Sequence, residues 1–367
     1  MRIGIDATSL LCAEPRGEGK SLLRLYQEIA CLRPDFSFVL FGVRKPGVSE
    51  AIPQIPRAKV VLFDCPGFRW NTWENVGLPW HAWIERIDVL HCASSGAPLW
   101  SPKPIVMTVH DLIPIVIDDG QTAAMRKVFH RRLSHGMRYA RMVIAVSENT
   151  SRDLASYFPN SSHLIKVIYW GGDPAAESPN RPIAAPYMLV LGGEAPRKNT
   201  WAAVQVFIQV APLFPELKLV IIGLGQIEAR NRLEALAAEH GILDRLIMPG
   251  FVSEQMLEAY YCYAECLCYL SLYEGFGLPL LEAMVHGVPV IASNCASIPE
   301  VVGNGGICVG PDDITGAAKA ITELLADSVI WKAASERARA QAERFSWKTT
   351  AIETINVLQL AYNRRPM

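Results

Sequence analysis

The amino-acid sequence predicts an α/β protein made of two parallel-sheet, Rossmann-like domains. Short apolar runs rich in β-branched residues alternate with helical patterns along the chain, which is typical of parallel sheets covered by helices. A proline- and alanine-rich stretch, DPAAESPNRPIAAP at Asp173–Pro186, interrupts this alternation and has the composition of a linker. The 367 residues are enough for two domains of ordinary size.

The first half of the chain, residues 1–174, predicts one domain. Its expected strands are Arg2–Ile5, Phe36–Phe41, Lys59–Phe63, Val89–His91, Ile105–Val109, Met142–Val146 and Lys166–Tyr169. Helical patterns lie between them, including Leu22–Cys31 and Met125–Arg141.

The pattern restarts after the linker and predicts a second domain at residues 175–345. Its expected strands are Tyr187–Leu191, Leu217–Ile222, Leu246–Met248, Leu267–Leu270, Val288–Ala292 and Ile307–Val309. A final segment, residues 346–367, carries one long helical pattern from about Trp347 to Tyr362.

Bulk properties narrow the classes of function. A net charge of −1 gives no reason to expect a nucleic-acid partner. Nine cysteines are scattered, and the closest group, Cys262, Cys266 and Cys268, lacks paired C-x-x-C spacing, so no metal site is expected. The N-terminus reads as a strand and not as a signal peptide, and no apolar run approaches the length of a membrane span. We therefore expect a cytoplasmic protein, either free or attached to the inner face of a membrane.

The most informative segment is SLYEGFGLPLLEAMVHG, at Ser271–Gly287. Two carboxylates, Glu274 and Glu282, flank a glycine-bracketed turn and the start of an expected helix at Leu278–His286. The unpaired N–H groups of a helix start favour phosphate, so Phe276, Gly277 and Leu278 are candidates for binding it. The competing interpretation is a buried turn and a solvated glutamate.

A second candidate site follows the expected strand Tyr187–Leu191, in the run GGEAPRKN that begins at Gly192. Arg197 and Lys198 at the mouth of a helix suit a diphosphate, whereas a solvated basic turn would need no ligand. Because ligands of open α/β sheets bind beyond the carboxyl ends of the strands, this turn and the Glu274 segment are expected to belong to one site.

Four further loops follow expected strands. Gly17 and Gly19 form a G-x-G turn ahead of a helix, and His110 in TVHDLIP ends a buried strand. Each also has a structural interpretation, as a plain turn or as a histidine that ends a strand with its hydrogen bonds satisfied. The loops containing Gly223 and Phe251–Val252 are candidates for holding a nucleoside.

These motifs together resemble the family 4 retaining glycosyltransferases of the GT-B fold. The run EGFGLPLLEAMVHGVPVIAS, at Glu274–Ser293, matches the E-x7-E signature of that family nearly position for position, and TVHDLIP and PRKN match two others. The resemblance covers almost the whole chain. It implies a final helix that crosses back onto the first domain. Departures are Ala195, Glu18 and Lys20-Ser21, and the last two put the acceptor contacts of the first loop in doubt.

For individual residues the resemblance implies definite tasks. Arg197 and Lys198 would hold the diphosphate of a nucleotide-sugar without a metal or other cofactor. Glu274 and His110 would contact the transferred sugar, and Glu282 would bind the ribose. The implied activity is transfer of a hexose, with GDP-mannose as first choice of donor, to a glycan or lipid-diphosphate-linked acceptor in surface-polysaccharide assembly. Two alternatives are a non-hydrolysing sugar-nucleotide epimerase and a catalytically silent sugar-nucleotide-binding subunit.

The expected helix Met125–Arg141 has two interpretations. It carries six basic residues, Arg126, Lys127, Arg131, Arg132, Arg138 and Arg141. They form either a solvated face or a contact with anionic lipid or a lipid-diphosphate acceptor. Trp70, Trp73, Trp80 and Trp83, earlier in the chain, suit a membrane interface or a core equally.

Overall fold

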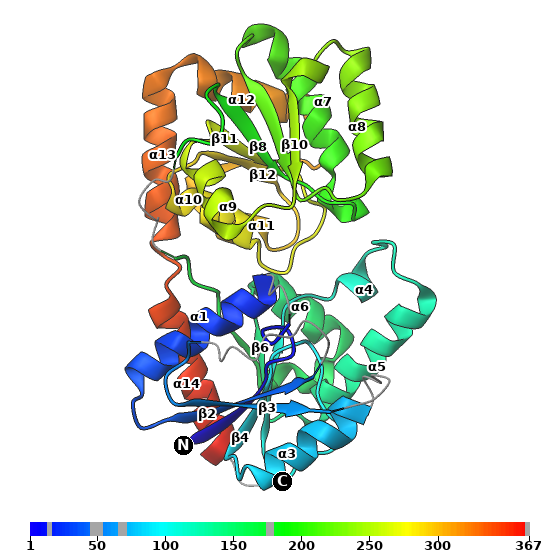
Figure 1. Ribbon diagram of the computed structural model, residues 1–367, viewed down its shortest axis with the longest axis vertical. Coiled ribbons are helices and arrows are strands. Elements are labelled where there is room, and N and C mark those ends of the chain that lie inside the picture. Colours follow the sequence, from blue (N-terminus) through cyan, green and yellow to red (C-terminus); the bar gives the residue numbers. More distant parts are fainter. Residues whose placement is uncertain (13–16, 45–53, 65–71, 174–179, 364–367) are drawn as a thin grey trace. The chain divides into compact units, whose positions relative to one another are not determined.

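The computed structural model describes residues 1–12, 17–44, 54–64, 72–173 and 180–363. The chain forms two compact units (Figure 1). Unit 1 comprises Met1–Val116, Gln121–Gly171 and Ser346–Met367, and unit 2 comprises Ile117–Gly120 and Gly172–Phe345. The predicted domains change over at residues 174 and 175, whereas the compact units change over between Gly171 and Gly172.

Unit 1 contains a parallel sheet in the order β3-β2-β1-β4-β5-β6-β7. The strands are β1 (Arg2–Asp6), β2 (Ser37–Val43), β3 (Ala58–Phe63), β4 (Val89–Cys92), β5 (Ile105–Val109), β6 (Met142–Ala145) and β7 (Ile165–Val167). Because the chain adds strands first on one side of β1 and then on the other, the strand order reverses between β1 and β4.

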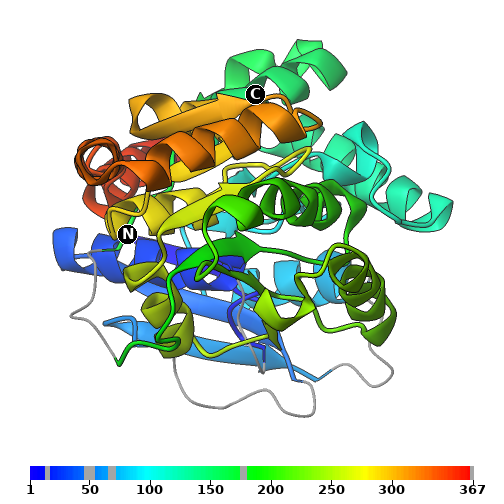
Figure 2. The same ribbon diagram turned by 90° about the horizontal axis from the view of Figure 1, so that it is seen from above.

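Helices cover both faces of this sheet (Figures 1 and 2). They are α1 (Gly17–Leu32), η1 (Trp73–Gly77), α3 (Leu78–Ile84), α4 (Ile113–Val116), α5 (Ala123–Tyr139), α6 (Glu148–Tyr157), η2 (Pro159–Leu164) and α14 (Trp347–Asn363). On one face α14 packs against α1 and the central strands. On the other, Leu133 of α5 and Leu154 of α6 share a core with Val39 and Leu90 of the sheet.

Unit 2 contains a parallel sheet in the order β10-β9-β8-β11-β12-β13. The strands are β8 (Tyr187–Leu191), β9 (Lys218–Ile222), β10 (Leu246–Gly250), β11 (Cys266–Tyr269), β12 (Val290–Ser293) and β13 (Gly306–Val309). The helical segments are η3 (Pro196–Lys198), α7 (Thr200–Val210), η4 (Ala211–Leu213), α8 (Ile227–Glu239), η5 (Leu243–Arg245), α9 (Glu254–Cys262), α10 (Leu278–Val285), α11 (Ile298–Val302), η6 (Gly303–Gly305), α12 (Ile314–Ala326) and α13 (Ser328–Ala342). Here the strand order reverses between β8 and β11.

The predicted fold class is confirmed, because every expected strand exists within two residues of its predicted bounds. One expectation about a loop is wrong. The G-x-G turn was placed ahead of a helix beginning near Leu22, but α1 already begins at Gly17. A Cβ atom at Gly19 would collide with the carbonyl oxygen of Ser9. The glycine therefore lets the first turn of the helix pack directly on the loop after β1.

Candidate active site

The chemistry-bearing residues of unit 2 gather where its strand order reverses. The turn after β8 carries Arg197 and Lys198, and the loop after the neighbouring strand β11 carries Glu274. Carboxyl ends of parallel strands meet at one edge of a sheet, and a reversal of strand order opens a crevice there. The sequence placed these three residues in one site, and the structure brings them into direct contact.

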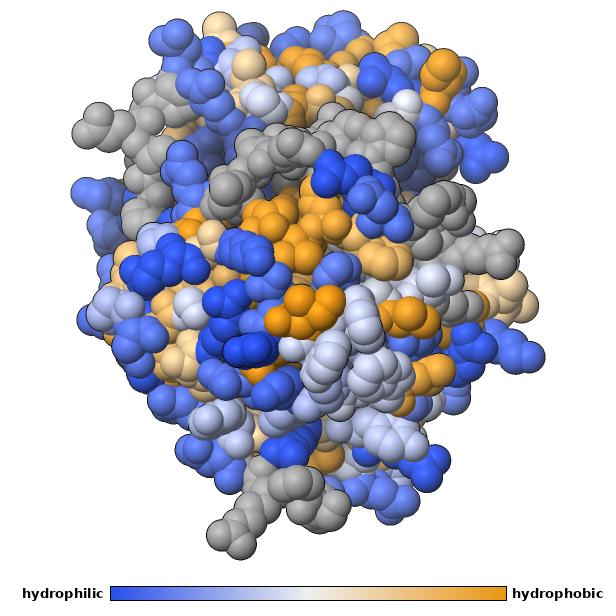
Figure 3. Space-filling model, turned by 60° about the horizontal axis from the view of Figure 1, so that its bottom comes forward, coloured by the Kyte–Doolittle hydropathy of each residue, from blue (hydrophilic) through white to orange (hydrophobic). Residues whose placement is uncertain are grey.

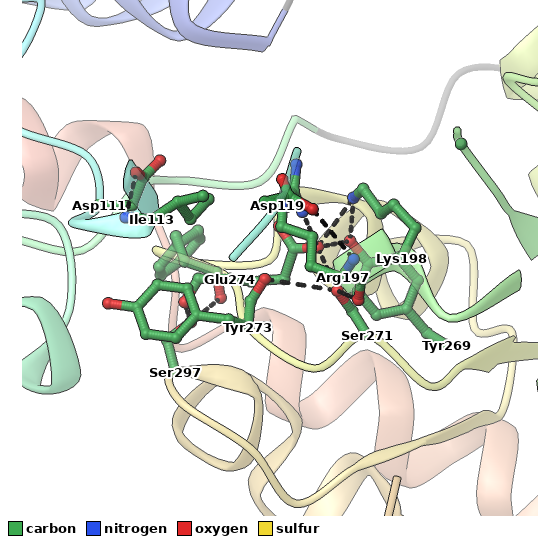
Figure 4. Close-up of polar contacts among 12 residues, drawn as sticks. Asp111, Ile113, Asp119, Arg197, Lys198, Tyr269, Ser271, Tyr273, Glu274 and Ser297 are labelled. Carbon is green, nitrogen blue, oxygen red and sulfur yellow. Dashed lines mark hydrogen bonds and ion pairs between the residues drawn. The ribbon is translucent and has the colours of Figure 1, made fainter. Parts of the chain in front are cut away.

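Glu274 is the centre of this cluster (Figure 4). Its Oε1 atom lies 2.8 Å from both Nη1 of Arg197 and Nζ of Lys198. The same oxygen accepts hydrogen bonds from Tyr269 Oη at 2.8 Å and from Ser271 Oγ at 2.6 Å. Lys198 Nζ also donates to Tyr269 Oη at 2.8 Å. One carboxylate oxygen therefore organises both candidate phosphate-binding cations.

The two cations decide the charge of Glu274. Burial alone would raise the pKa of this carboxyl, but Lys198 and Arg197 together outweigh burial and hold the pKa of Glu274 below its ordinary value. Burial and the adjacent Glu274 both raise the pKa of Tyr269 well above its ordinary value. Glu274 is thus a constant anion and Tyr269 a constant hydrogen-bond donor at neutral pH.

A second carboxylate, Asp119, contacts the same arginine (Figure 4). Its Oδ1 accepts a hydrogen bond from the backbone N–H of Arg197 at 3.0 Å, and its Oδ2 lies 3.0 Å from Arg197 Nε. Sequence reasoning missed Asp119, because the residue stands among elements of the first half and no motif marks it.

The turn before α10 is held by side chains from outside it. Gly277 is the N-cap residue at φ +106°, a conformation that favours glycine. Ser297 Oγ donates to the carbonyl oxygens of Glu274 and Phe276 at 2.8 and 2.9 Å. The ring of Phe276 is buried and packs edge-on against Phe345. The side chain of Phe276 is thereby explained by packing, and Leu278 opens the helix.

Glu282 lies one turn inside α10 and is exposed. Its Oε2 accepts a hydrogen bond from Tyr261 Oη at 2.9 Å. The ring of Tyr261 stacks on His286, the C-cap residue of α10. The two glutamates of the motif thus differ: Glu274 is enclosed by cations, whereas Glu282 is an accessible acceptor.

The remaining candidates in unit 2 lie on the loops after β8, β9 and β10. Backbone hydrogen bonds from Gly192 to Ile222 and from Gly223 to Gly250 extend the sheet into these loops. Phe251 is 61% exposed and is followed by the half-buried Val252.

Glu194 is a further residue that sequence reasoning did not single out. Its Oε1 accepts from the backbone N–H groups of Gly225 and Gln226 at 2.7 and 2.8 Å. It therefore fixes the loop after β9 to the loop after β8.

In unit 1, His110 follows β5, and its side chain contacts residues of the same unit. Its Nε2 donates to the carbonyl oxygen of Ala93 at 2.7 Å, and its ring stacks on Trp170. Glu18, the middle residue of the G-x-G turn, accepts from Ser94 Oγ at 2.5 Å and lies 3.8 Å from His110 Nε2. With Nε2 protonated, Nδ1 is the ring atom that can accept a hydrogen bond from a hydroxyl.

The tryptophans at positions 70–83 and the basic residues of α5 include both enclosed and exposed side chains. Trp73 is fully buried, whereas Trp80 and Trp83 are 52% and 58% exposed, and Trp70 lies outside the described residues. Arg132 is paired with Glu74 at 2.8 Å, and Arg141 donates to the carbonyl oxygen of Ala361. The exposed basic residues of α5 are Lys127, Arg131 and Arg138.

Two classes of feature are absent from the described part of the chain. No group of three or more His, Cys, Asp or Glu residues there is arranged to hold a metal ion. No helix among the same residues is long and apolar enough to cross a membrane.

Family models match both halves of the chain. The model described as Glycosyltransferase Family 4 matches residues 19–176, and that described as Glycosyl transferases group 1 matches residues 176–344. The chain is 29% identical over 267 residues to O-antigen chain mannosyltransferase B of Escherichia coli, covering 70% of each chain. It is 31% identical over 282 residues to the MMP alpha-(1->4)-mannosyltransferase of Mycolicibacterium hassiacum, covering 71% of this chain and 66% of that protein.

Solved structures share the fold at low sequence identity. Sucrose-phosphate synthase from Thermosynechococcus elongatus superposes with a TM-score of 0.77 at 19% identity, covering 99% of both chains. Anabaena HepE in complex with UDP-glucose gives 0.75 at 18% identity, covering 98% of this chain and 100% of that one. WaaG, a glycosyltransferase involved in lipopolysaccharide biosynthesis, gives 0.72 at 13% identity, covering 98% and 99%.

Proposed function

Because this chain belongs to the family 4, group 1 glycosyltransferases and has their GT-B fold, we propose that it is a retaining mannosyltransferase that uses GDP-mannose. The acceptor is a glycan or a lipid-diphosphate-linked glycan of surface-polysaccharide assembly. The names of the mannosyltransferase relatives support the choice of sugar. The observation that carries the proposal is the cluster of Arg197, Lys198 and Glu274 at the reversal of strand order.

The phosphates of the donor bind at Arg197, Lys198 and the N-terminus of α10. The C–O bond between the sugar and the diphosphate breaks, and the two cations offset the negative charge on the leaving group. The anomeric carbon becomes oxocarbenium-like and is attacked from the side of the leaving group, where a phosphate oxygen accepts the proton of the acceptor hydroxyl. This charge balance needs no metal ion.

Glu274 contacts the donor sugar through Oε2. All the hydrogen bonds and ion pairs described above for this carboxylate involve Oε1, so Oε2 is the atom available to a sugar hydroxyl. His110 accepts from a second sugar hydroxyl through Nδ1. Glu282 binds the ribose hydroxyls, and the loops carrying Gly17, Gly19, Gly192, Gly223 and Phe251–Val252 approach the rest of the donor.

Unit 1, which would bind the acceptor, contacts an anionic membrane surface through α3 and α5. Trp80 and Trp83 are exposed neighbours, with ring centroids 5.3 Å apart. The turn η1, which leads into α3, is tied to basic helix α5 by the ion pair of Glu74 and Arg132. Exposed indoles and the exposed cations Lys127, Arg131 and Arg138 of the same unit suit an anionic lipid interface. Figure 3 shows orange apolar groups lying among hydrophilic ones on one face; tryptophan is weakly hydrophilic on this scale and is not among the orange groups.

Co-sedimentation with vesicles tests this surface. Replacing Trp80 and Trp83 by alanine should reduce binding to phosphatidylglycerol vesicles, with little binding to phosphatidylcholine by either form. Trp201→Ala, which removes a 46% exposed indole from unit 2, is the matched control. Equal binding by all three proteins would contradict the membrane contact.

A panel of radiolabelled nucleotide sugars tests the activity, with and without lipid-linked acceptors and with and without EDTA. We expect transfer of mannose from GDP-mannose, dependent on acceptor and insensitive to EDTA. Interconversion of the donor sugar without an acceptor would indicate an epimerase. Binding of nucleotide sugar with no turnover would indicate a silent subunit. Loss of activity in EDTA that a divalent ion restores would overturn metal independence.

A further inference from the structure

Asp119 is the carboxylate that the proposed chemistry leaves unexplained. It comes from Ile117–Gly120, the four residues between α4 and α5 that belong to unit 2. Its side chain is 6% exposed and holds Arg197 through the backbone N–H and through Nε, at 3.0 Å each. Figure 4 shows Asp119 in the same cluster of side chains as Glu274 and Lys198.

The charges of this group cancel. Arg197 and Lys198 contribute two positive charges, and Glu274 and Asp119 contribute two negative charges. Arg197 is paired with both carboxylates, and Lys198 is paired with Glu274. While both carboxylates stay paired, the two cations have no net positive charge left with which to offset a diphosphate. Two carboxylates also compete with the phosphate oxygens for the same N–H groups. Release of one carboxylate on donor binding would leave the cluster with a net positive charge.

Asp119 is the carboxylate that can be released, because fewer contacts hold it than hold Glu274. Glu274 is anchored by both cations, by Tyr269 and Ser271, and through its backbone by Ser297. Among the described residues of unit 2, the polar contacts of the Asp119 side chain are those with Arg197. A backbone N–H and a guanidinium converging on two carboxylate oxygens also form the type of donor set that binds phosphate.

We propose that Asp119 is an internal counter-ion, which the diphosphate of the donor displaces from Arg197. This proposal rests on the proposed function, because it takes the same cluster as the phosphate site. Asp119 lowers the affinity for every ligand that carries the diphosphate. Its return to Arg197 after transfer speeds the release of the nucleoside diphosphate product.

Calorimetry on two isosteric variants tests the proposal. Asp119→Asn keeps an acceptor for the backbone N–H of Arg197 but removes the charge. It should bind GDP or UDP about tenfold more tightly than the wild type. Guanosine and uridine, which lack phosphates, should bind equally to both proteins. Asp118→Asn makes the same charge change at the exposed neighbouring residue and should behave as the wild type.

Turnover gives an independent measurement. If product release is faster with Asp119 present, Asp119→Asn should slow multiple turnovers and leave the rate of a single turnover unchanged. Thermal denaturation verifies that the variant is folded, and Asp119→Ala provides a second variant with the same expected gain in affinity.

The outcomes separate the two proposals. Unchanged or weaker diphosphate binding in folded Asp119→Asn and Asp119→Ala would show that Asp119 only positions Arg197, and would overturn this inference alone. Failure of the wild type to bind either nucleoside diphosphate would overturn the proposed function and this inference with it.

Discussion

Two buried carboxylates, one in each unit, have opposite electrostatic environments. Asp6 ends β1 beside the reversal of strand order in unit 1, and Glu274 follows β11 beside the reversal in unit 2. Burial raises the pKa of Asp6 to about 6, although hydrogen bonds from Thr8 oppose the shift. The pKa of Glu274 is lowered despite comparable burial, because Lys198 and Arg197 contact it directly.

The difference lies in direct ion pairing, because both Arg197 and Lys198 lie 2.8 Å from Glu274. Arg132, the cation that acts on Asp6, is paired with Glu74 at 2.8 Å. Asp6 is therefore a carboxyl that burial pushes toward the neutral form, whereas Glu274 is kept ionised by its partners. Buried carboxylates beside the reversals of strand order in the two sheets thus give one titrating group and one fixed charge.

Removing the charge of Glu274 should have the largest effect on stability. Glu274→Gln leaves the half-buried Arg197 and Lys198 with one carboxylate fewer and removes a buried charge from between them. It should lower the free energy of unfolding at pH 7 by about 3–5 kcal/mol. Urea denaturation measures this, with Glu282→Gln on the exposed face of α10 as the matched control. A loss below about 1 kcal/mol would mean that the cluster does not depend on the charge.

Removing the charge of Asp6 should have the opposite effect on stability and raise the free energy of unfolding. A folded-state pKa of about 6 against an ordinary 3.8 means that the folded protein binds the proton more tightly, so stability falls as pH rises from about 4 to 6. Asp6→Asn should therefore raise the free energy of unfolding by about 3 kcal/mol at pH 7.5 and change it little at pH 4. The same gain at both pH values would show that Asp6 does not titrate in this range.

Removing one cation from the cluster should weaken ligand binding. Lys198→Ala deletes a charge-assisted contact to the diphosphate and should weaken binding of the nucleoside diphosphate by about 1.5–3 kcal/mol, with a further loss in turnover. Lys319→Ala, which removes an exposed lysine from α12, is the control. Unchanged affinity and turnover in Lys198→Ala would remove it from the phosphate site.

The smallest expected effect separates the two glutamates of the motif. Glu282→Gln weakens a hydrogen-bond acceptor for the ribose and should lower the affinity for both the nucleoside and its diphosphate by about 1 kcal/mol. Glu274→Gln should leave nucleoside binding unchanged but depress transfer of the sugar. Calorimetry with guanosine and uridine, paired with turnover on the intact donor, measures both. Equal loss of nucleoside affinity in the two variants would contradict this division of tasks.

Much of the fold and part of the site could be predicted from local sequence. The strands β5 and β8 were predicted to the residue, because a short β-branched apolar run between polar turns has few other solutions. The helix start at Leu278 followed from the glycine turn before it, and the basic turn at Arg197 and Lys198 followed from its place after a strand. These features depend on neighbours in the chain.

Only the tertiary structure decided which of these charged groups form ion pairs with one another. The pairing of Arg197 with Glu274 spans 77 residues, and its pairing with Asp119 spans 78. Neither has a sequence signal, because strand order and the course of Ile117–Gly120 are set by long-range packing. The start of α1 at Gly17 was missed for the same reason, since it depends on close contact with Ser9. Sequence determined the residue types that could form a phosphate site, and packing determined their net charge by placing two carboxylates against two cations.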